Sequence, residues 1–95
     1  MNELRFEWDE HKSRANIAKH QVSFDEAQTV FADTNARVIN DPDHSDDEER
    51  FIIMGISSRL RIVVVCHCYR EDDEVIRIIS ARKATKGEVN SYGKR

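Results

Sequence analysis

The chain has 95 residues, of which 39% are hydrophobic and 35% are charged, and its formal net charge is −3. This length suits a single domain over residues 1–95, and no apolar run approaches the roughly 18 residues that a membrane span requires. The N-terminus lacks the apolar segment of a signal peptide, and the acidic balance is unusual for a general nucleic-acid binder, so we expect a cytoplasmic protein.

The first third of the chain predicts one short strand followed by two helices. Residues 4–8 alternate apolar and charged side chains, as a half-buried strand does. Asp9 is a suitable N-cap for a helix over about 10–20. The Ser23–Glu26 segment has the spacing of a capping box, in which each side chain bonds the other's backbone amide, and it predicts a second helix over about 24–32.

The rest of the chain predicts four strands and a short final helix. The strands are expected at 36–40, 50–56, 60–69 and 75–82, and the helix at a second capping box, Thr85–Glu88. Residues 41–49 form an acidic stretch that we expect to be mobile. Short turns join the last three strands, which favours an antiparallel meander. The predicted fold class is therefore α+β, with an antiparallel sheet packed by two N-terminal helices and a short C-terminal helix.

Alternation along the longest strand separates two faces of the predicted sheet. One set of side chains is apolar or thiol and is predicted to lie in the core: Leu60, Ile62, Val64, Cys66 and Cys68. The other set mixes valines with polar groups and is predicted to lie on a half-open face: Arg61, Val63, Val65, His67 and Tyr69. Arg77 of the last strand is expected to join His67, and Arg82 to lie at the strand end.

The two cysteines give no sign of a disulfide or a metal site. At positions i and i+2 of a strand they lie almost 7 Å apart, which is too far for an easy disulfide. No second pair of ligands accompanies them, so we expect free thiols, no metal and no cofactor.

Several side chains are suited to cleaving RNA without a metal ion. That reaction needs a base, an acid and cations that hold the phosphate. The candidate catalytic residues are Glu49, Arg61, His67, Arg77 and Arg82. The candidate RNA-binding residues are Lys12, Lys19, Arg50, Tyr69, Ser80 and Lys83.

Each candidate also has a structural interpretation. Arg61 and Arg77 are equally explained by ion pairs with acidic neighbours, and His67 by a hydrogen-bonded structural histidine. The Lys19-His20 pair at a helix C-terminus is explained by the helix dipole.

An ordered set of short motifs resembles the BrnT family. It begins with Glu7-Trp8-Asp9 and the segment Val22 to Ala27, and it continues with Glu49-Arg50, Arg61 to Val65 and Ile78 to Ala84. The resemblance covers nearly the whole chain. The sequence departs from it at Leu60, where family members commonly carry glycine.

The resemblance implies a RelE-like ribonuclease toxin of a bacterial type II toxin–antitoxin system, which cuts RNA without a metal and arrests growth. It implies a BrnA-like antitoxin that binds DNA, so that operator DNA is reached only through the complex. It also adds weight to the following site residues: Glu49, Arg50, Arg61, Arg77, Ser80 and Arg82. Two other interpretations remain open, namely a non-catalytic module that binds a partner or RNA, and a degenerate toxin that acts only within an autorepressing complex.

Overall fold

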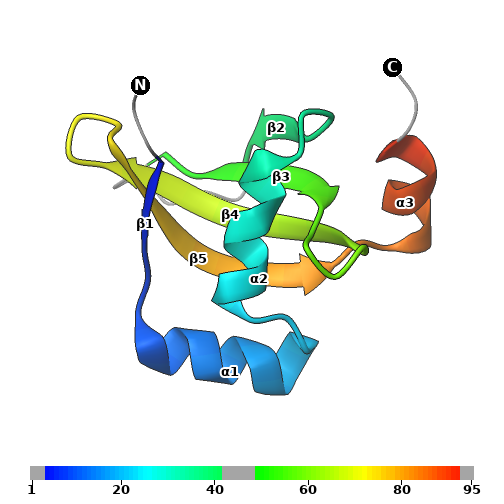
Figure 1. Ribbon diagram of the computed structural model, residues 1–95, viewed down its shortest axis with the longest axis horizontal. Helices are drawn as coiled ribbons and strands as arrows, with labels where there is room; N and C mark the ends of the chain where they lie inside the picture. The colour runs from blue at the N-terminus through cyan, green and yellow to red at the C-terminus, as the bar shows by residue number, and fades with distance from the viewer. Residues whose placement is uncertain (1–3, 42–48, 93–95) are drawn as a thin grey trace.

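The computed structural model describes residues 4–41 and 49–92, and the elements follow the predicted order (Figure 1). The strands are β1 (Arg5–Glu7), β2 (Arg37–Asn40), β3 (Phe51–Ile56), β4 (Ile62–Arg70) and β5 (Val75–Lys83). The helices are α1 (Glu10–His20), α2 (Phe24–Thr29), the short 3₁₀ helix η1 (Val30–Ala32) and α3 (Lys86–Tyr92). The predicted helix over 24–32 is therefore divided into α2 and η1. Most of the acidic stretch 41–49 lies outside the described residues.

The strands form one five-stranded sheet in the order β1-β5-β4-β3-β2. The pairs β2–β3, β3–β4 and β4–β5 are antiparallel, which confirms the predicted meander. The prediction of a wholly antiparallel sheet is wrong at one edge, because β1 pairs with β5 in parallel. The sheet is therefore mixed, and its first and last strands in the chain are neighbours.

The two predicted capping boxes differ in the structure. The Ser23 hydroxyl accepts the amide of Glu26 at 3.0 Å, as predicted. The Glu26 carboxylate does not reach back, however, because it binds Arg61 instead. At α3 the box is complete, since the amide of Glu88 donates to Thr85 Oγ1 at 3.2 Å and the amide of Thr85 donates to Glu88 Oε1 at 2.8 Å.

The core lies between the helices and one face of the sheet. Helix α2 crosses that face, and α1 runs along the border of the sheet next to β5 (Figure 1). The fully buried side chains from both layers include Val22, Phe24, Ala27, Val30, Val63 and Val65. Buried Asn16 ties α1 to the sheet, because its amide nitrogen donates to the carbonyls of Val22 and Ala81 at 2.8 Å each. Its oxygen accepts the Ala81 amide at 3.2 Å.

The predicted assignment of the faces of β4 is wrong about which face the helices cover, although Val64 and Cys68 are buried as predicted. The set predicted to be half-open is the one that the helices cover, since Val63, Val65 and His67 are fully buried. Leu60 was predicted in the core but is 86% exposed, in the turn before β4. Composition misled the prediction because the polar members of the covered face find partners there: Arg61 binds Glu26, and His67 packs against an aromatic ring.

A register shift between Cys66 and His67 decides which β5 side chains share a face. Cys66 pairs with Ser80 but His67 pairs with Ile78, which leaves one extra residue in β5. Arg77 therefore lies opposite Cys68, on the face away from His67, and the prediction that it joins His67 is wrong. We call this second face the open face; it carries Ile52, Val64, Cys66, Arg77, Ser80 and Arg82.

Candidate functional site

Arg61 lies in a partly buried ion pair on the helix-covered face. Its Nε and Nη2 donate to the two carboxylate oxygens of Glu26 at 2.7 and 2.6 Å, and Nη2 also donates to the Gln21 carbonyl at 2.6 Å. The Ser57 hydroxyl donates to the same carboxylate at 2.7 Å. Arg61 holds the pKa of Glu26 below its usual value. The guanidinium of Arg61 thus binds groups of the helix layer, namely Glu26 and the Gln21 carbonyl.

His67 is enclosed by aromatic rings. Its ring lies 4.8 Å from that of Phe31 and 5.4 Å from that of Tyr69, centroid to centroid, and the side chain is fully buried. Burial lowers the pKa of the imidazole, so it is neutral at pH 7. The structure therefore places His67 in the core, away from solvent and from the open face.

A depression of about 340 Å³ lies on the open face. It is lined by residues of β3, β4 and β5, the end of α1 and the end of β2: His20, Asp41, Arg50, Ile52, Val64, Cys66, Ile79, Ser80, Ala81 and Arg82. Three predicted site residues, Arg50, Ser80 and Arg82, come together there. We call it the open-face pocket. Two guanidinium groups and a hydroxyl in one depression suit a ligand with phosphate oxygens.

Arg82 is held in place by Glu88 of α3. Its Nη1 and Nη2 donate to the two carboxylate oxygens of Glu88 at 2.8 and 3.0 Å, which is a bidentate pair. This contact lowers the pKa of Glu88 to about 2 and raises that of Arg82. Both charges persist across the physiological range, so α3 fixes the direction in which this guanidinium points.

Three ionisable lining residues were not predicted as part of a site: His20, Asp41 and Cys66. His20 ends α1 and reaches the pocket only because α1 runs beside β5. The Cys66 thiol donates to Asp41 Oδ2 at 3.5 Å, and burial followed by the Asp41 contact raises the pKa of the thiol to about 11. The sequence carries no local signal for these residues, since they are joined only by the tertiary fold.

The other predicted residues lie elsewhere. Arg77 is on the open face but outside the pocket, and its Nη1 donates to Glu7 of β1 at 2.7 Å. Glu49 and Tyr69 line a separate pocket at one end of the sheet.

The predicted lysines lie on the surface. Lys12 and Lys19 are exposed on α1, where the Lys12 amide donates to the Asp9 cap at 3.2 Å. Lys83 is also exposed, and its ammonium donates to the Gln21 side chain at 3.2 Å.

Residues 4–41 and 49–92 lack both a cluster of metal ligands and a helix that could span a membrane. They contain no group of three or more His, Cys, Asp or Glu side chains placed to hold a metal ion. Their helices are too short or too polar for any of them to cross a membrane.

Comparison with known proteins gives a family match and a structural match. The family model described as "Ribonuclease toxin, BrnT, of type II toxin-antitoxin system" matches residues 8–88, which include every residue that lines the open-face pocket. Among solved structures, the chain is similar to the ribonuclease toxin BrnT of Brucella abortus, with a TM-score of 0.67 and 28% identity. That similarity covers 88% of this chain and 100% of the other. No curated protein sequence matches the chain.

Proposed function

This chain belongs to the BrnT family of ribonuclease toxins from type II toxin–antitoxin systems, and on that premise we propose that it cleaves RNA at the open-face pocket without a metal ion. One observation carries the proposal: Arg50 and Arg82 come from different segments of the chain and line one depression with Ser80 and His20. A guanidinium group is always charged, and two of its N–H groups can bind two oxygens of one phosphate. Two such groups in one depression therefore favour the binding of a phosphodiester.

The proposed reaction is an attack by a ribose 2′-oxygen on the neighbouring phosphorus. The bond to the 5′-oxygen of the next nucleotide breaks, which leaves a cyclic phosphate and a free 5′-hydroxyl. A base takes the 2′ proton and an acid gives a proton to the departing oxygen. Imidazole is the side chain that most readily exchanges protons near neutral pH, so we assign this work to His20, with Asp41 as the second candidate.

The two arginines stabilise the charge that builds up on the phosphate in the transition state. Donors that are already fixed in place are most effective, because they need no reorganisation when the charge develops. Glu88 supplies such fixation for Arg82, since it engages one edge of the guanidinium and leaves other N–H groups of its five for a phosphate. Glu88 is thus a positioning residue in this proposal, and Ser80 a further hydrogen-bond donor.

Cleavage of a fluorescently labelled RNA by the purified chain, in buffer with EDTA, tests the proposal. Arg50→Ala and Arg82→Ala should each lower the cleavage rate about 10²- to 10³-fold, as loss of a transition-state donor does. Arg77→Ala is the matched control, because Arg77 lies on the same face and also binds a carboxylate but is outside the pocket. It should retain the rate to within a few-fold.

Two outcomes would contradict the proposal. If all three variants lose activity equally, the pocket is not the site. If the wild-type chain binds RNA with steep salt dependence but never cuts it, the chain is a binding module and not a ribonuclease.

We also propose that the partner is a BrnA-like antitoxin and that the toxin acts on RNA in the bacterial cytoplasm by RelE-like, metal-independent cleavage. Family membership supports an antitoxin partner without identifying which antitoxin it is. Expression of the chain alone should arrest growth, and co-expression with the protein encoded by the adjacent gene should relieve the arrest. Harmless expression alone, with a stable complex on operator DNA, would favour a degenerate toxin that acts only as part of a repressor.

A further inference from the structure

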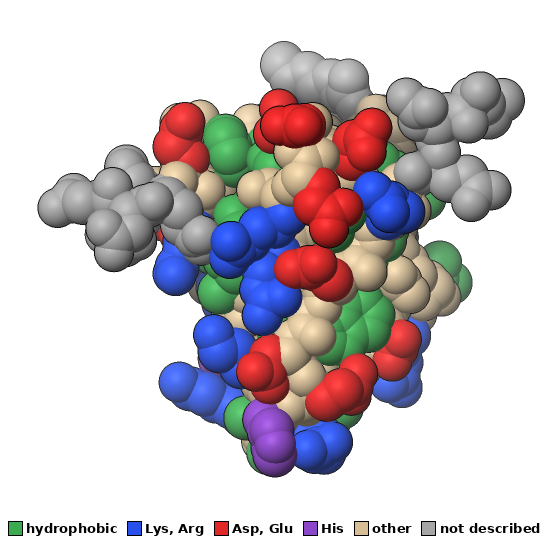
Figure 2. All heavy atoms as spheres, turned by 90° about the vertical axis from the view of Figure 1, so that its left-hand side faces the viewer, with side chains coloured by type: hydrophobic (Ala, Val, Ile, Leu, Met, Phe, Trp, Pro, Cys, Tyr) green, Lys and Arg blue, Asp and Glu red, His purple; other side chains and the backbone are tan. Residues whose placement is uncertain are grey.

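One end of the sheet is acidic, in contrast to the arginine-lined open-face pocket. The turn between β4 and β5 consists of Glu71, Asp72, Asp73 and Glu74, and Arg5 of β1 balances it in part through contacts to Glu71 and Glu74 at 3.3 and 3.5 Å. Figure 2, which faces the side where β1 and this turn lie, shows acidic side chains gathered along its upper part. Such a surface repels a phosphate chain and attracts a cation.

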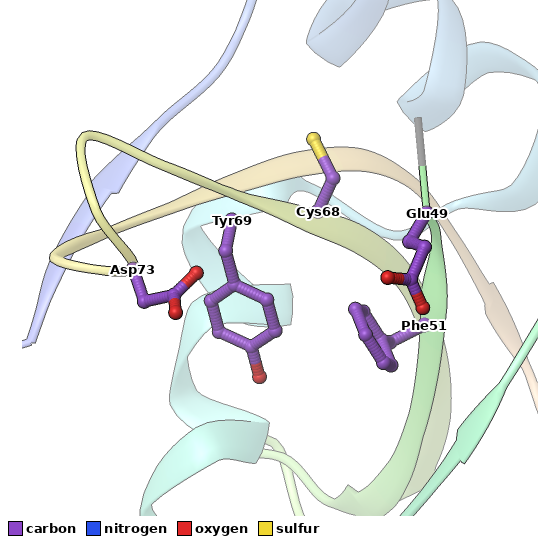
Figure 3. Close-up of a pocket in the computed structure, with 5 residues that line it drawn as sticks. All are labelled: Glu49, Phe51, Cys68, Tyr69 and Asp73. Carbon is purple, nitrogen blue, oxygen red and sulfur yellow. The ribbon is translucent and has the colours of Figure 1, made fainter. Parts of the chain in front are cut away.

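A pocket of about 480 Å³ lies at this acidic end. It is lined by Glu49, Phe51, Cys68, Tyr69 and Asp73. The rings of Phe51 and Tyr69 meet edge to face, 5.3 Å apart at 64°, and form its wall. Figure 3 shows the two carboxylates on either side of these rings and the Cys68 thiol pointing away from them. We call it the aromatic–acidic pocket.

The carboxylates of this pocket are available to a ligand. In the described part of the chain, neither Glu49 nor Asp73 forms a hydrogen bond or an ion pair, whereas Glu7, Glu26 and Glu88 each bind an arginine. The negative charge of Asp73 also acts on the neighbouring ring, because the pKa of Tyr69 is raised by burial first and by the charge of Asp73 second.

A buried hydrogen-bond acceptor adjoins the same rings. The His67 ring is 5.4 Å from Tyr69 and 6.1 Å from Phe51, and its Nδ1 lies 3.4 Å from the carbonyl of Val65. If Nδ1 carries the proton, Nε2 is an acceptor, and it has no hydrogen-bond partner in residues 4–41 and 49–92. The lining of the pocket therefore offers carboxylate acceptors and aromatic faces, which suits a ligand that only donates, and the His67 acceptor is buried next to the same rings.

From this arrangement we propose that the aromatic–acidic pocket receives an arginine side chain of a protein partner. A guanidinium stacks on aromatic rings and binds carboxylates through paired N–H groups, so it satisfies both parts of the pocket at once. A neutral apolar side chain would leave the carboxylates unpaired, and an RNA base would bring its phosphate against Glu49 and Asp73. The partner that family membership implies is the antitoxin, and the proposal does not depend on the catalytic role of the open-face pocket.

Titration of the ¹⁵N-labelled chain with N-acetyl-arginine amide, followed by NMR, tests the proposal. The probe has blocked ends, so it mimics a side chain within a protein and not free arginine. Saturable shifts should centre on Phe51, Tyr69 and Asp73, and N-acetyl-norleucine amide should cause none. The Glu49→Gln/Asp73→Asn double variant should bind at least about five-fold more weakly, as loss of two partly exposed ion pairs predicts. Asp72→Asn, a change in the same turn outside the pocket, is the matched control and should bind as wild type does.

Three results would overturn the proposal. The first is the absence of saturable shifts in the wild-type chain. The second is equal binding by the double variant and the Asp72→Asn control. The third is a stronger response of the same residues to guanosine monophosphate, which would make the pocket an RNA-base site. Because RNA cleavage by the open-face pocket is measured separately, each proposal can fail without the other.

Discussion

The two faces of the sheet hold their arginines in different environments. On the helix-covered face, Arg61 binds a carboxylate whose side chain is only 4% exposed. On the open face, Arg82 binds Glu88 with similar distances, but both side chains are about a third or more exposed, at 41% and 33%. The same chemical pair is therefore part of the core in one place and part of a surface pocket in the other. Pair geometry alone therefore does not distinguish the two arginines, whereas the exposure of the pair does.

The largest expected difference between the faces is in stability. Glu26→Ala should lower the free energy of unfolding by about 3 kcal/mol, because it leaves a partly buried guanidinium without its carboxylate. Glu88→Ala should cost less, about 1 kcal/mol, since water screens the open-face pair and the lost cap contact to the Thr85 amide is at the exposed start of a short helix. Urea denaturation followed by circular dichroism measures both. Equal losses in the two variants would remove the distinction drawn between the faces.

Acid should act on the buried pair in a predictable direction. The pKa of Glu26 is lowered by the Arg61 contact, so its contribution to stability is complete above its ordinary value of 4.5 and is lost as pH falls through the lower, folded value. Unfolding free energies at pH 7, 4 and 3 should therefore fall more steeply in the wild type than in Glu26→Gln. Glu88→Gln controls for a second carboxylate with a lowered pKa, which is about 2. Parallel curves for wild type and Glu26→Gln would contradict the assignment.

Most of the fold could be predicted from the sequence, because its signals are local. Strand alternation and the caps at Ser23 and Thr85 placed the elements within a few residues of where they occur. The parallel pairing of β1 with β5 could not be predicted in this way, because the choice of neighbour for a three-residue edge strand depends on how the helices return the chain to the sheet.

The site was harder to predict, for two physical reasons. The helices cover the face of β4 that carries Arg61 and His67, and a strand of mixed composition does not reveal which face its helices will choose. The register shift beside His67 then moves Arg77 to the other face, which simple alternation cannot anticipate. Arg50, Ser80 and Arg82, which lie past that shift or on another strand, meet in the open-face pocket, whereas His20 reaches it only through the position of α1.

A smaller effect is expected in the chemical reactivity of the Cys66 thiol, which reports how closely the open-face pocket surrounds it. With its pKa raised to about 11, Cys66 should react with N-ethylmaleimide far more slowly than a cysteine in an unfolded peptide, since the thiolate is the reactive form. Asp41→Asn should speed the reaction several-fold, because Asp41 both accepts from the thiol and disfavours its negative charge. The reaction is followed by mass spectrometry in the Cys68→Ser variant, in which Cys66 is the one remaining cysteine. Wild-type labelling as fast as the peptide would show that the pocket is not closed around this thiol.

The smallest effect is expected where the chain passes from β3 to β4. Leu60 has a φ of 61° and is 86% exposed, so it adopts a left-handed conformation without a packing contact that would offset the strain. Leu60→Gly should raise the free energy of unfolding by about 0.5 kcal/mol, since glycine relieves this strain but also gains freedom in the unfolded chain.

Ser58→Gly in the same turn is the control and should lower stability, because Ser58 has no positive φ to relieve. RNA cleavage should be unchanged in both, because neither residue lines the open-face pocket. A destabilised Leu60→Gly would mean that the exposed leucine is held by contacts other than those of its turn.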